Sequence, residues 1–147
     1  MRLALFLIVL IIAGGMAYIR LAPSDPARWN VDPPPYADAI APGPEGVTTV
    51  PLGARARLAM PDASPEDLLA RLDAIALATP RTTRLAGSPE SGRITWITRS
   101  LIFGFPDYTT AQVSDAAIDL YARERFGRYD FGVNAARLRD WTGQLGP

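Results

Sequence analysis

The residues best suited to binding or chemistry lie near the C-terminus, in residues 118–141. This stretch is rich in arginine, aspartate, aromatic residues and glycine, and it has the pattern of a strand that turns into a helix at two glycines. Arginines beside a helix N-terminus can hold a phosphate or a lipid head group, because the free backbone N–H groups there also favour an anion. The candidate ligand-binding residues of such an anion site are Arg125, Arg128, Asp130, Asn134 and Arg137.

The same residues also have a structural interpretation that needs no ligand. The glycines on either side of Asp130 permit backbone angles that other residues avoid. Asn134 would cap the last helix, an interaction worth about 1 kcal/mol. Asp130 would pair with Arg125 or Arg137 and fix the strand to the helix. This structural interpretation and the anion site are two expectations for one set of residues.

Three aspartates, at positions 115, 119 and 130, raise the question of a metal or acid–base site. Asp115 and Asp119 are expected on one face of a strand over residues 109–123. Four residues of extended chain separate their Cα atoms by about 13 Å. Two carboxylates that far apart cannot share a small ion, so cross-strand pairing with arginine is the favoured role. We expect no metal and no cofactor.

The residue types that the chain lacks exclude several classes of enzyme. There is no cysteine and no histidine. A Ser-His-Asp triad, a thiolate nucleophile, the common zinc sites and a histidine-ligated haem are therefore impossible. The net charge is zero, and all basic residues are arginine. Such a balance argues against nucleic-acid binding, which needs a basic surface. We expect a protein that is not an enzyme.

The N-terminal segment is apolar enough to enter a membrane. Residues 3–19 are uncharged and lie between Arg2 and Arg20. As a helix they span about 26 Å, slightly less than a hydrocarbon core of roughly 30 Å, and snorkelling arginines make up the difference. We expect residues 1–22 to be an anchor that contacts lipid through residues 3–19. The alternative is a signal peptide cleaved after Ala17. Either would place the following domain in the periplasm, and the anchor would make it a single-pass protein of the cell inner membrane.

A proline-rich linker over residues 23–46 follows this segment. Seven prolines lie between positions 23 and 44, and neither a helical nor a strand period is present. Such a chain is extended and semi-rigid, which predicts a spacer that lifts a domain off a surface. Trp29 and Tyr36 are exceptions to its polarity. They are expected at the bilayer interface, on the domain surface or against a partner membrane protein.

The remaining residues, 47–147, have the pattern of one α+β domain. A helix is expected from Ser64, followed by Pro65 and ended by Pro80, with apolar residues on one face. A second helix is expected over residues 135–145, capped by Asn134. Because the strands are joined by tight turns and the helices do not alternate with them, we expect a small, mainly antiparallel sheet. The amphipathic helix and the C-terminal helix would cover one face. The strands are expected at residues 47–50, 54–59, 81–86, 93–103 and 109–123.

Two segments resemble a bacterial and plastid family described as domain of unknown function 1499. Residues 96–107 look like the family's strand that ends in an aromatic-Gly-Phe turn and an aspartate. Residues 125–134 are similar to its Arg-x-Gly-x-x-Asp-x-Gly-x-Asn signature, and Arg137 follows where the family has a basic residue. The resemblance covers residues 64–145 and implies a fold and a membrane or envelope setting, but no reaction. The chain lacks the cysteine segment near the domain start and the serines before the signature.

The expected function follows from an anchor, a linker, a small neutral domain and the lack of a catalytic set. We expect an envelope-facing accessory or assembly protein of a membrane complex, acting through contact with a membrane-protein partner. The alternative is a binding module for an anionic lipid head group or a small anion, at the arginine-rich turn before the last helix.

Overall fold

A computed structural model describes residues 1–34, 46–59, 64–114, 117–127 and 129–146. Four helices and six strands lie within these ranges, and their order is consistent with one α+β domain behind an N-terminal helix. The elements are α1 (Arg2–Leu21), α2 (Pro26–Trp29), β1 (Val47–Val50), β2 (Gly53–Ala59), α3 (Pro65–Ala78), β3 (Thr82–Ser88), β4 (Arg93–Arg99), β5 (Pro106–Ser114), β6 (Ala117–Glu124) and α4 (Val133–Leu145).

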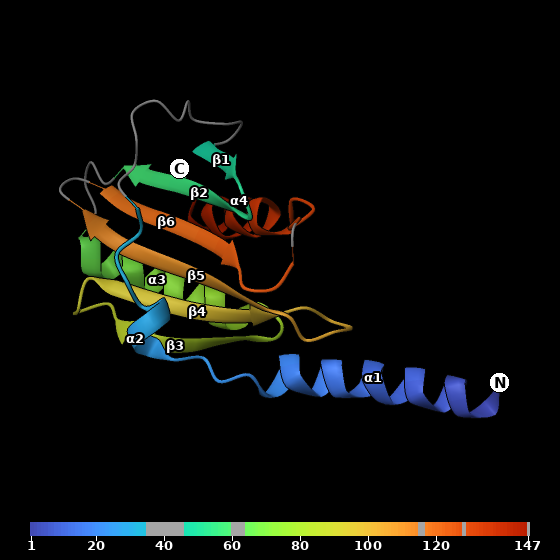
Figure 1. Cartoon of the computed structure of the whole chain (residues 1–147). Coiled ribbons are helices and arrows are strands. Elements are labelled where there is room, and N and C mark those ends of the chain that lie inside the picture. The colour runs from blue at the N-terminus through green and yellow to red at the C-terminus, as the bar shows by residue number, and fades with distance from the viewer. Residues whose placement is uncertain (35–45, 60–63, 115–116, 128, 147) are drawn as a thin grey trace.

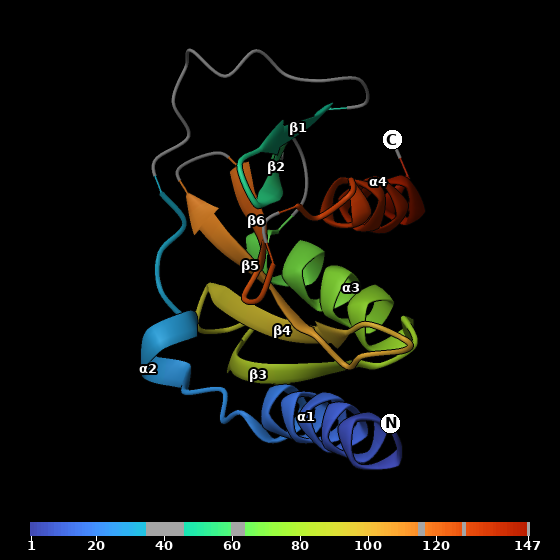
Figure 2. The same ribbon diagram turned by 45° about the vertical axis from the view of Figure 1, so that its right-hand side comes forward.

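The strands form a single antiparallel sheet in the order β1-β2-β6-β5-β4-β3. Helices α3 and α4 pack side by side on one face of this sheet, α3 over β3 and β4 and α4 over β1, β2 and β6. Figure 1 shows these two helices behind the strands, and Figure 2 shows them one above the other on the right of the sheet. The predicted α+β fold, with both helices on one face of an antiparallel sheet, is confirmed.

The predicted single strand over residues 109–123 is wrong. The structure has two strands there, β5 and β6, paired as a hairpin in which Ser114 lies opposite Ala117. No glycine or proline marks the reversal, and only the phase of the apolar positions changes there, from Ala111 and Val113 to Ile118 and Leu120. Asp115 lies outside the described residues. The strand that was expected to reach Phe103 also ends earlier, at Arg99.

The core lies between the sheet and the two helices. The buried faces of α3 and α4 are the predicted ones, and Trp96 from β4 and Trp141 from α4 meet edge to face at 5.5 Å. One charged group is buried with them. Asp73 of α3 accepts hydrogen bonds from Trp96 Nε1 at 2.8 Å and from Arg84 Nε at 3.0 Å. This carboxylate therefore ties α3 to β3 and β4.

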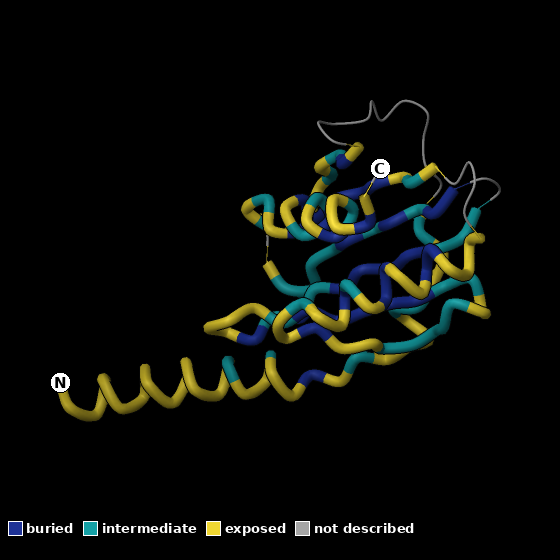
Figure 3. The backbone as a smooth tube through the Cα atoms, turned by 180° about the vertical axis from the view of Figure 1, so that it is seen from behind, coloured by how far each residue is buried: buried dark blue, intermediate teal, exposed yellow. Residues whose placement is uncertain are grey.

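Helix α1 extends away from the domain, and its apolar side chains are exposed along almost its whole length (Figure 3). By length and composition it is long and apolar enough to cross a membrane, and among the described residues no other helix is. It ends at Leu21, directly before the proline-rich segment.

Residues 22–32, which include most of the linker residues described before the gap (23–34), lie against the sheet. The ring of Trp29 stacks on Tyr108 of β5, with centroids 3.8 Å apart and planes 5° from parallel. Asn30 accepts a hydrogen bond from Thr95 at 3.0 Å. Tyr108 and Thr95 point to the face opposite Trp96, because neighbouring residues of a strand alternate. The spacer interpretation is thus wrong for residues 22–32, and Trp29 lies on the domain surface, one of its predicted positions. Tyr36 is outside the described residues.

Candidate functional site

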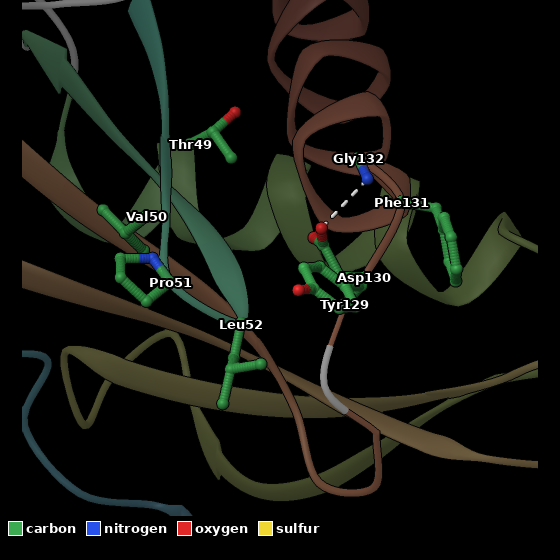
Figure 4. Close-up of a pocket in the computed structure, with 8 residues that line it drawn as sticks. All are labelled: Thr49, Val50, Pro51, Leu52, Tyr129, Asp130, Phe131 and Gly132. Carbon is green, nitrogen blue, oxygen red and sulfur yellow. Dashed lines mark hydrogen bonds between the residues drawn. The ribbon is translucent and has the colours of Figure 1, made fainter.

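The turn into α4 is built by Asp130. Its Oδ1 accepts the backbone N–H of Gly132 at 2.9 Å (Figure 4), and its Oδ2 accepts that of Asn134 at 3.3 Å. Gly132 is the N-cap residue and has a φ of +77°, which glycine adopts without strain. Asparagine was the predicted cap, and that prediction is wrong: Asn134 lies inside the first turn and is fully buried. An aspartate two residues before the N-cap performs the capping instead.

Arg137 pairs with Asp107 at the start of β5 rather than with Asp130. The distance from its Nη2 to Asp107 Oδ2 is 3.1 Å, and 8% and 17% of the two side chains are exposed. Its Nη1 also donates to Asn134 Oδ1 at 2.6 Å. Burial raises the pKa of Asp107, and the charge and hydrogen bond of Arg137 oppose that rise. This pair joins α4 to the sheet.

Arg125 lies on the opposite side of the sheet from Arg137. Its Nη1 donates to the carbonyl oxygen of Pro23 at 2.9 Å and to Tyr108 Oη at 3.1 Å. Of the five predicted ligand-binding residues, the structure brings Asp130, Asn134 and Arg137 together and separates Arg125 from them. Arg128 lies outside the described residues.

Sequence reasoning missed a second cluster, which we call the docking cluster: Trp29, Tyr108, Arg123 and Arg125. Arg123 donates from Nη2 to the carbonyl oxygen of Trp29 at 2.6 Å and from Nη1 to Thr110 Oγ1 at 3.2 Å. Its guanidinium lies 5.5 Å from the Trp29 ring centre. Burial lowers the pKa of Arg123. Arg123 in β6 and Arg125 just after it were the sequence feature that could have indicated this cluster. Their side chains hold residues 22–32 on the sheet.

The family model described as "Protein of unknown function (DUF1499)" matches residues 31–145. The chain belongs to this family. No curated protein matches it. The DUF1499 match includes the turn into α4 and three of the four docking-cluster residues, and it starts two positions after Trp29. The resemblance found in residues 96–107 and 125–134 is therefore confirmed.

Two open grooves of this DUF1499 domain meet at the Asp130 turn. One, of about 420 Å³, lies between the β1–β2 turn at Pro51 and Leu52 and the turn into α4 (Figure 4). The other, of about 370 Å³, has aromatic walls and three carboxylates. Among the described residues that line it there is no arginine, and these residues do not favour an anion. Its main side chains are Phe105, Asp107, Glu124, Phe126, Asp130 and Phe131.

No group of three or more acidic residues in the described ranges is arranged to hold a metal ion. The three carboxylates of the aromatic-walled groove nevertheless interact. Burial raises the pKa of Glu124, and the negative charges of Asp107 and Asp130 raise it further. Among the described residues, Arg137 forms an ion pair with this group, through Asp107. This makes the Asp107–Arg137 pair the main electrostatic element of the turn.

Replacing Arg137 with methionine is expected to lower the free energy of unfolding at neutral pH by about 3 kcal/mol, because a buried carboxylate loses its partner. The effect depends on pH. A raised folded-state pKa means that the folded protein binds the proton more tightly, so stability falls as pH rises above about 4 through the folded pKa of Asp107. Without Arg137 the folded-state pKa of Asp107 rises further. The fall in the free energy of unfolding with pH is then larger and continues to higher pH. Urea unfolding of the full chain in detergent, from pH 4 to 7, measures this.

Asp107→Asn in the Arg137→Met background is the matched control. It removes the titrating group, so the additional pH dependence is expected to disappear while the arginine is still absent. If Arg137→Met has the same dependence on pH as the unchanged protein, the pair does not control the ionisation of Asp107.

Proposed function

We propose that this protein is a single-pass, membrane-anchored accessory or assembly protein of the cell inner membrane. Its domain would face the periplasm and act, without catalysis, through contact with a membrane-protein partner. The docking of residues 22–32 on the sheet is the observation that supports this most directly. It joins the domain firmly to the end of α1, as expected of a protein that must present one surface next to a membrane.

The anchor is supported by the exposure and the ends of α1. The helix has 20 residues, with Arg2 at its start and Arg20 in its last turn. Twenty residues span about 30 Å, the thickness of a hydrocarbon core. Arg20 Nη2 donates to the carbonyl oxygen of Ile102 at 2.8 Å, so the end of α1 contacts the domain directly. An anchor in this position would hold the domain at the membrane surface.

A partner surface is supported by the exposed apolar side chains of the turn into α4. Tyr129, Phe131 and Val133 are exposed, and Phe131 is 92% exposed. Phe131 also has a φ of +52°, an unfavourable conformation for a bulky residue. Strain and exposed aromatic surface are both retained more often where they serve binding. Aromatic residues are also enriched among the residues that dominate protein–protein contacts.

The alternative function, binding of an anionic lipid head group or a small anion at the arginine-rich turn, has less support. The Asp130 carboxylate already accepts two N–H groups at the start of α4, and it would repel an anion there. Arg125 and Arg137 each have other partners. We therefore keep the partner-binding proposal as the conclusion.

Capture of the full-length protein from mildly solubilised membranes tests this proposal. We expect a membrane protein to be recovered in stoichiometric amount with the unchanged chain, and at least tenfold less of it with Phe131→Gly. Glycine relieves the positive φ, so the free energy of unfolding should stay the same or rise by about 1 kcal/mol. The control is Leu77→Ala, at an exposed apolar residue of α3, and it should recover the partner as the unchanged chain does. Alanine is used there because glycine would disrupt the helix.

Equal recovery of that partner by Phe131→Gly would exclude the turn as its binding surface. Recovery of the chain only as a free monomer would contradict an accessory role. Intact-mass analysis of the same sample shows whether residue 1 is retained. Loss of the N-terminal segment would mean a cleaved signal peptide and would remove the anchor from the proposal.

A further inference from the structure

The connection between β4 and β5 presents an apolar tip to the surface. Leu101, Ile102 and Phe103 follow one another there, and the first two are 74% and 66% exposed. Three consecutive exposed apolar residues are unfavourable in water unless a function requires them. These three side chains would therefore be more favourably placed in an apolar environment than in water.

Hydrogen bonds close this turn on itself. The Ser100 N–H donates to the carbonyl oxygen of Phe105 at 2.9 Å, and the Phe105 N–H donates to Ser100 Oγ at 3.0 Å. Gly104 has a φ of +73° and donates its N–H to the Ser100 carbonyl at 3.1 Å. Both ends of the tip are thus held, and its side chains project from a defined loop.

The tip lies beside the last turns of α1. Arg20 donates to Ile102 from one side, and a Cβ at Gly104 would lie 2.9 Å from Arg20 Cγ, so only glycine fits there. Figures 1 and 2 both show the β4–β5 connection next to α1, at the end of the sheet towards which α1 extends. Met16 and Ile19 are partly covered, whereas their neighbours on the helix are exposed.

Aromatic rings connect the two elements. Tyr18 of α1 meets Phe126 with ring centres 6.3 Å apart, Phe126 meets Phe105 at 6.3 Å, and Phe105 meets Phe103 at 5.5 Å. Aromatic residues of this kind are favoured at the boundary between a membrane and water. The row therefore marks the level at which a bilayer that contains α1 would end.

The depth of the tip follows from helix geometry. Arg20 would lie at the head groups, and Met16 would lie about 6 Å deeper, since an α-helix rises 1.5 Å per residue. Interfacial apolar segments are buried by roughly 5–10 Å at the head-group and acyl boundary. The tip contacts Arg20 at the end of α1, so its side chains fall at the head-group and acyl boundary.

We propose that Leu101, Ile102 and Phe103 insert into the lipid bilayer beside the C-terminal turn of α1, as a second membrane contact of the domain. The inference rests on the proposed anchoring of α1. A helix alone would leave the domain free to rotate about the chain at its end. The second contact fixes which side of the domain faces the membrane. It also fixes which side, including the turn into α4, stays free to meet a partner in the plane of the membrane.

The chain has no cysteine, so single-cysteine labelling is unambiguous. The full-length protein, in lipid nanodiscs of phosphatidylethanolamine and phosphatidylglycerol, carries one environment-sensitive fluorophore at Ile102→Cys, Val9→Cys or Leu77→Cys. We expect the Ile102 label to be quenched by lipids with a nitroxide near the head group and to be several-fold less accessible to iodide than the Leu77 label. The Val9 label should be quenched by nitroxides deep in the acyl chains. Leu101→Cys should behave like Ile102→Cys.

The control positions separate failure of this inference from failure of the anchor. If the Val9 label is in lipid while the Ile102 and Leu101 labels are as accessible to iodide as Leu77, insertion of the tip is overturned and the anchor is retained. If the Val9 label is in water, both proposals are overturned. A tip that is accessible in pure lipid but protected in native membranes is covered by a protein partner, which also overturns insertion.

Discussion

Replacing Trp96 with alanine is expected to lower the free energy of unfolding by about 4 kcal/mol, enough to unfold a marginally stable domain. Trp96 is fully buried at the centre of the core. Its removal leaves a cavity beside Trp141, whose ring edge it contacts, and takes the indole N–H away from Asp73. A buried carboxylate that loses a donor adds its own cost to that of the cavity.

Chemical denaturation of the full chain in detergent measures this change, and Trp96→Phe is the matched control. Phenylalanine keeps much of the apolar volume but has no N–H, so we expect it to cost about 2 kcal/mol. The difference between the two variants then reports the cavity. Asp73 keeps its interaction with Arg84 in both. A loss below about 1 kcal/mol for Trp96→Ala would mean that the tryptophan pair is not the centre of the core.

The elements that could be predicted from the sequence are those determined by neighbouring residues. Helix α3 starts after Ser64 with a proline and ends before Pro80, and its apolar spacing indicates the buried face. The β5–β6 hairpin could not be predicted in this way. No glycine or proline marks the reversal, and the sequence shows it only as a change of phase. The core-facing residues are Ala111 and Val113 before the turn, at odd positions, and Ile118 and Leu120 after it, at even positions.

The sequence indicated the turn into α4 as a candidate site, but it did not indicate most of the contacts that the structure shows there. The turn into α4 offers two capping side chains, Asp130 and Asn134, and local pattern alone does not decide between them. The local sequence pattern could not indicate contacts between residues that are far apart in the chain. The Arg125–Pro23 hydrogen bond joins residues 102 positions apart, and the Arg123–Trp29 bond joins residues 94 apart. The excess of arginine was visible, but its explanation required the linker to fold back onto the sheet.

Replacing Trp29 with alanine is expected to release residues 22–32 from the sheet. The substitution removes the stacked ring from Tyr108 and the aromatic surface over which Arg123 and Arg125 lie. Loss of a half-buried tryptophan and its stacking costs about 2 kcal/mol. Because the segment lies outside the core, we expect the loss to appear as local opening rather than as unfolding of the domain. The remaining contacts of Ser24, Asn30 and Asp32 with the sheet oppose that opening.

Limited trypsin digestion measures this opening, since Arg28 lies within the docked segment and exposure of its backbone depends on release. A cost of about 2 kcal/mol corresponds to cleavage after Arg28 that is roughly 30-fold faster. Arg123→Met, which weakens docking without altering residue 29, should also increase the rate and controls for protease preference at the changed site. Unchanged rates in both variants would contradict the docking role of the cluster.

Release of the segment should also change how the domain meets the membrane. In the Trp29→Ala background, the label at Ile102→Cys is expected to lose most of its protection from iodide, while the label at Val9→Cys stays in lipid. The reason is geometric: the Arg20–Ile102 hydrogen bond is exposed and weak, and Tyr18–Phe126 is a single ring contact, so we expect the docked linker to supply much of the hold of the β4–β5 tip on α1. If the tip stays protected without Trp29, its own apolar side chains are sufficient to hold it in the bilayer, and the docking cluster serves only the stability of the linker.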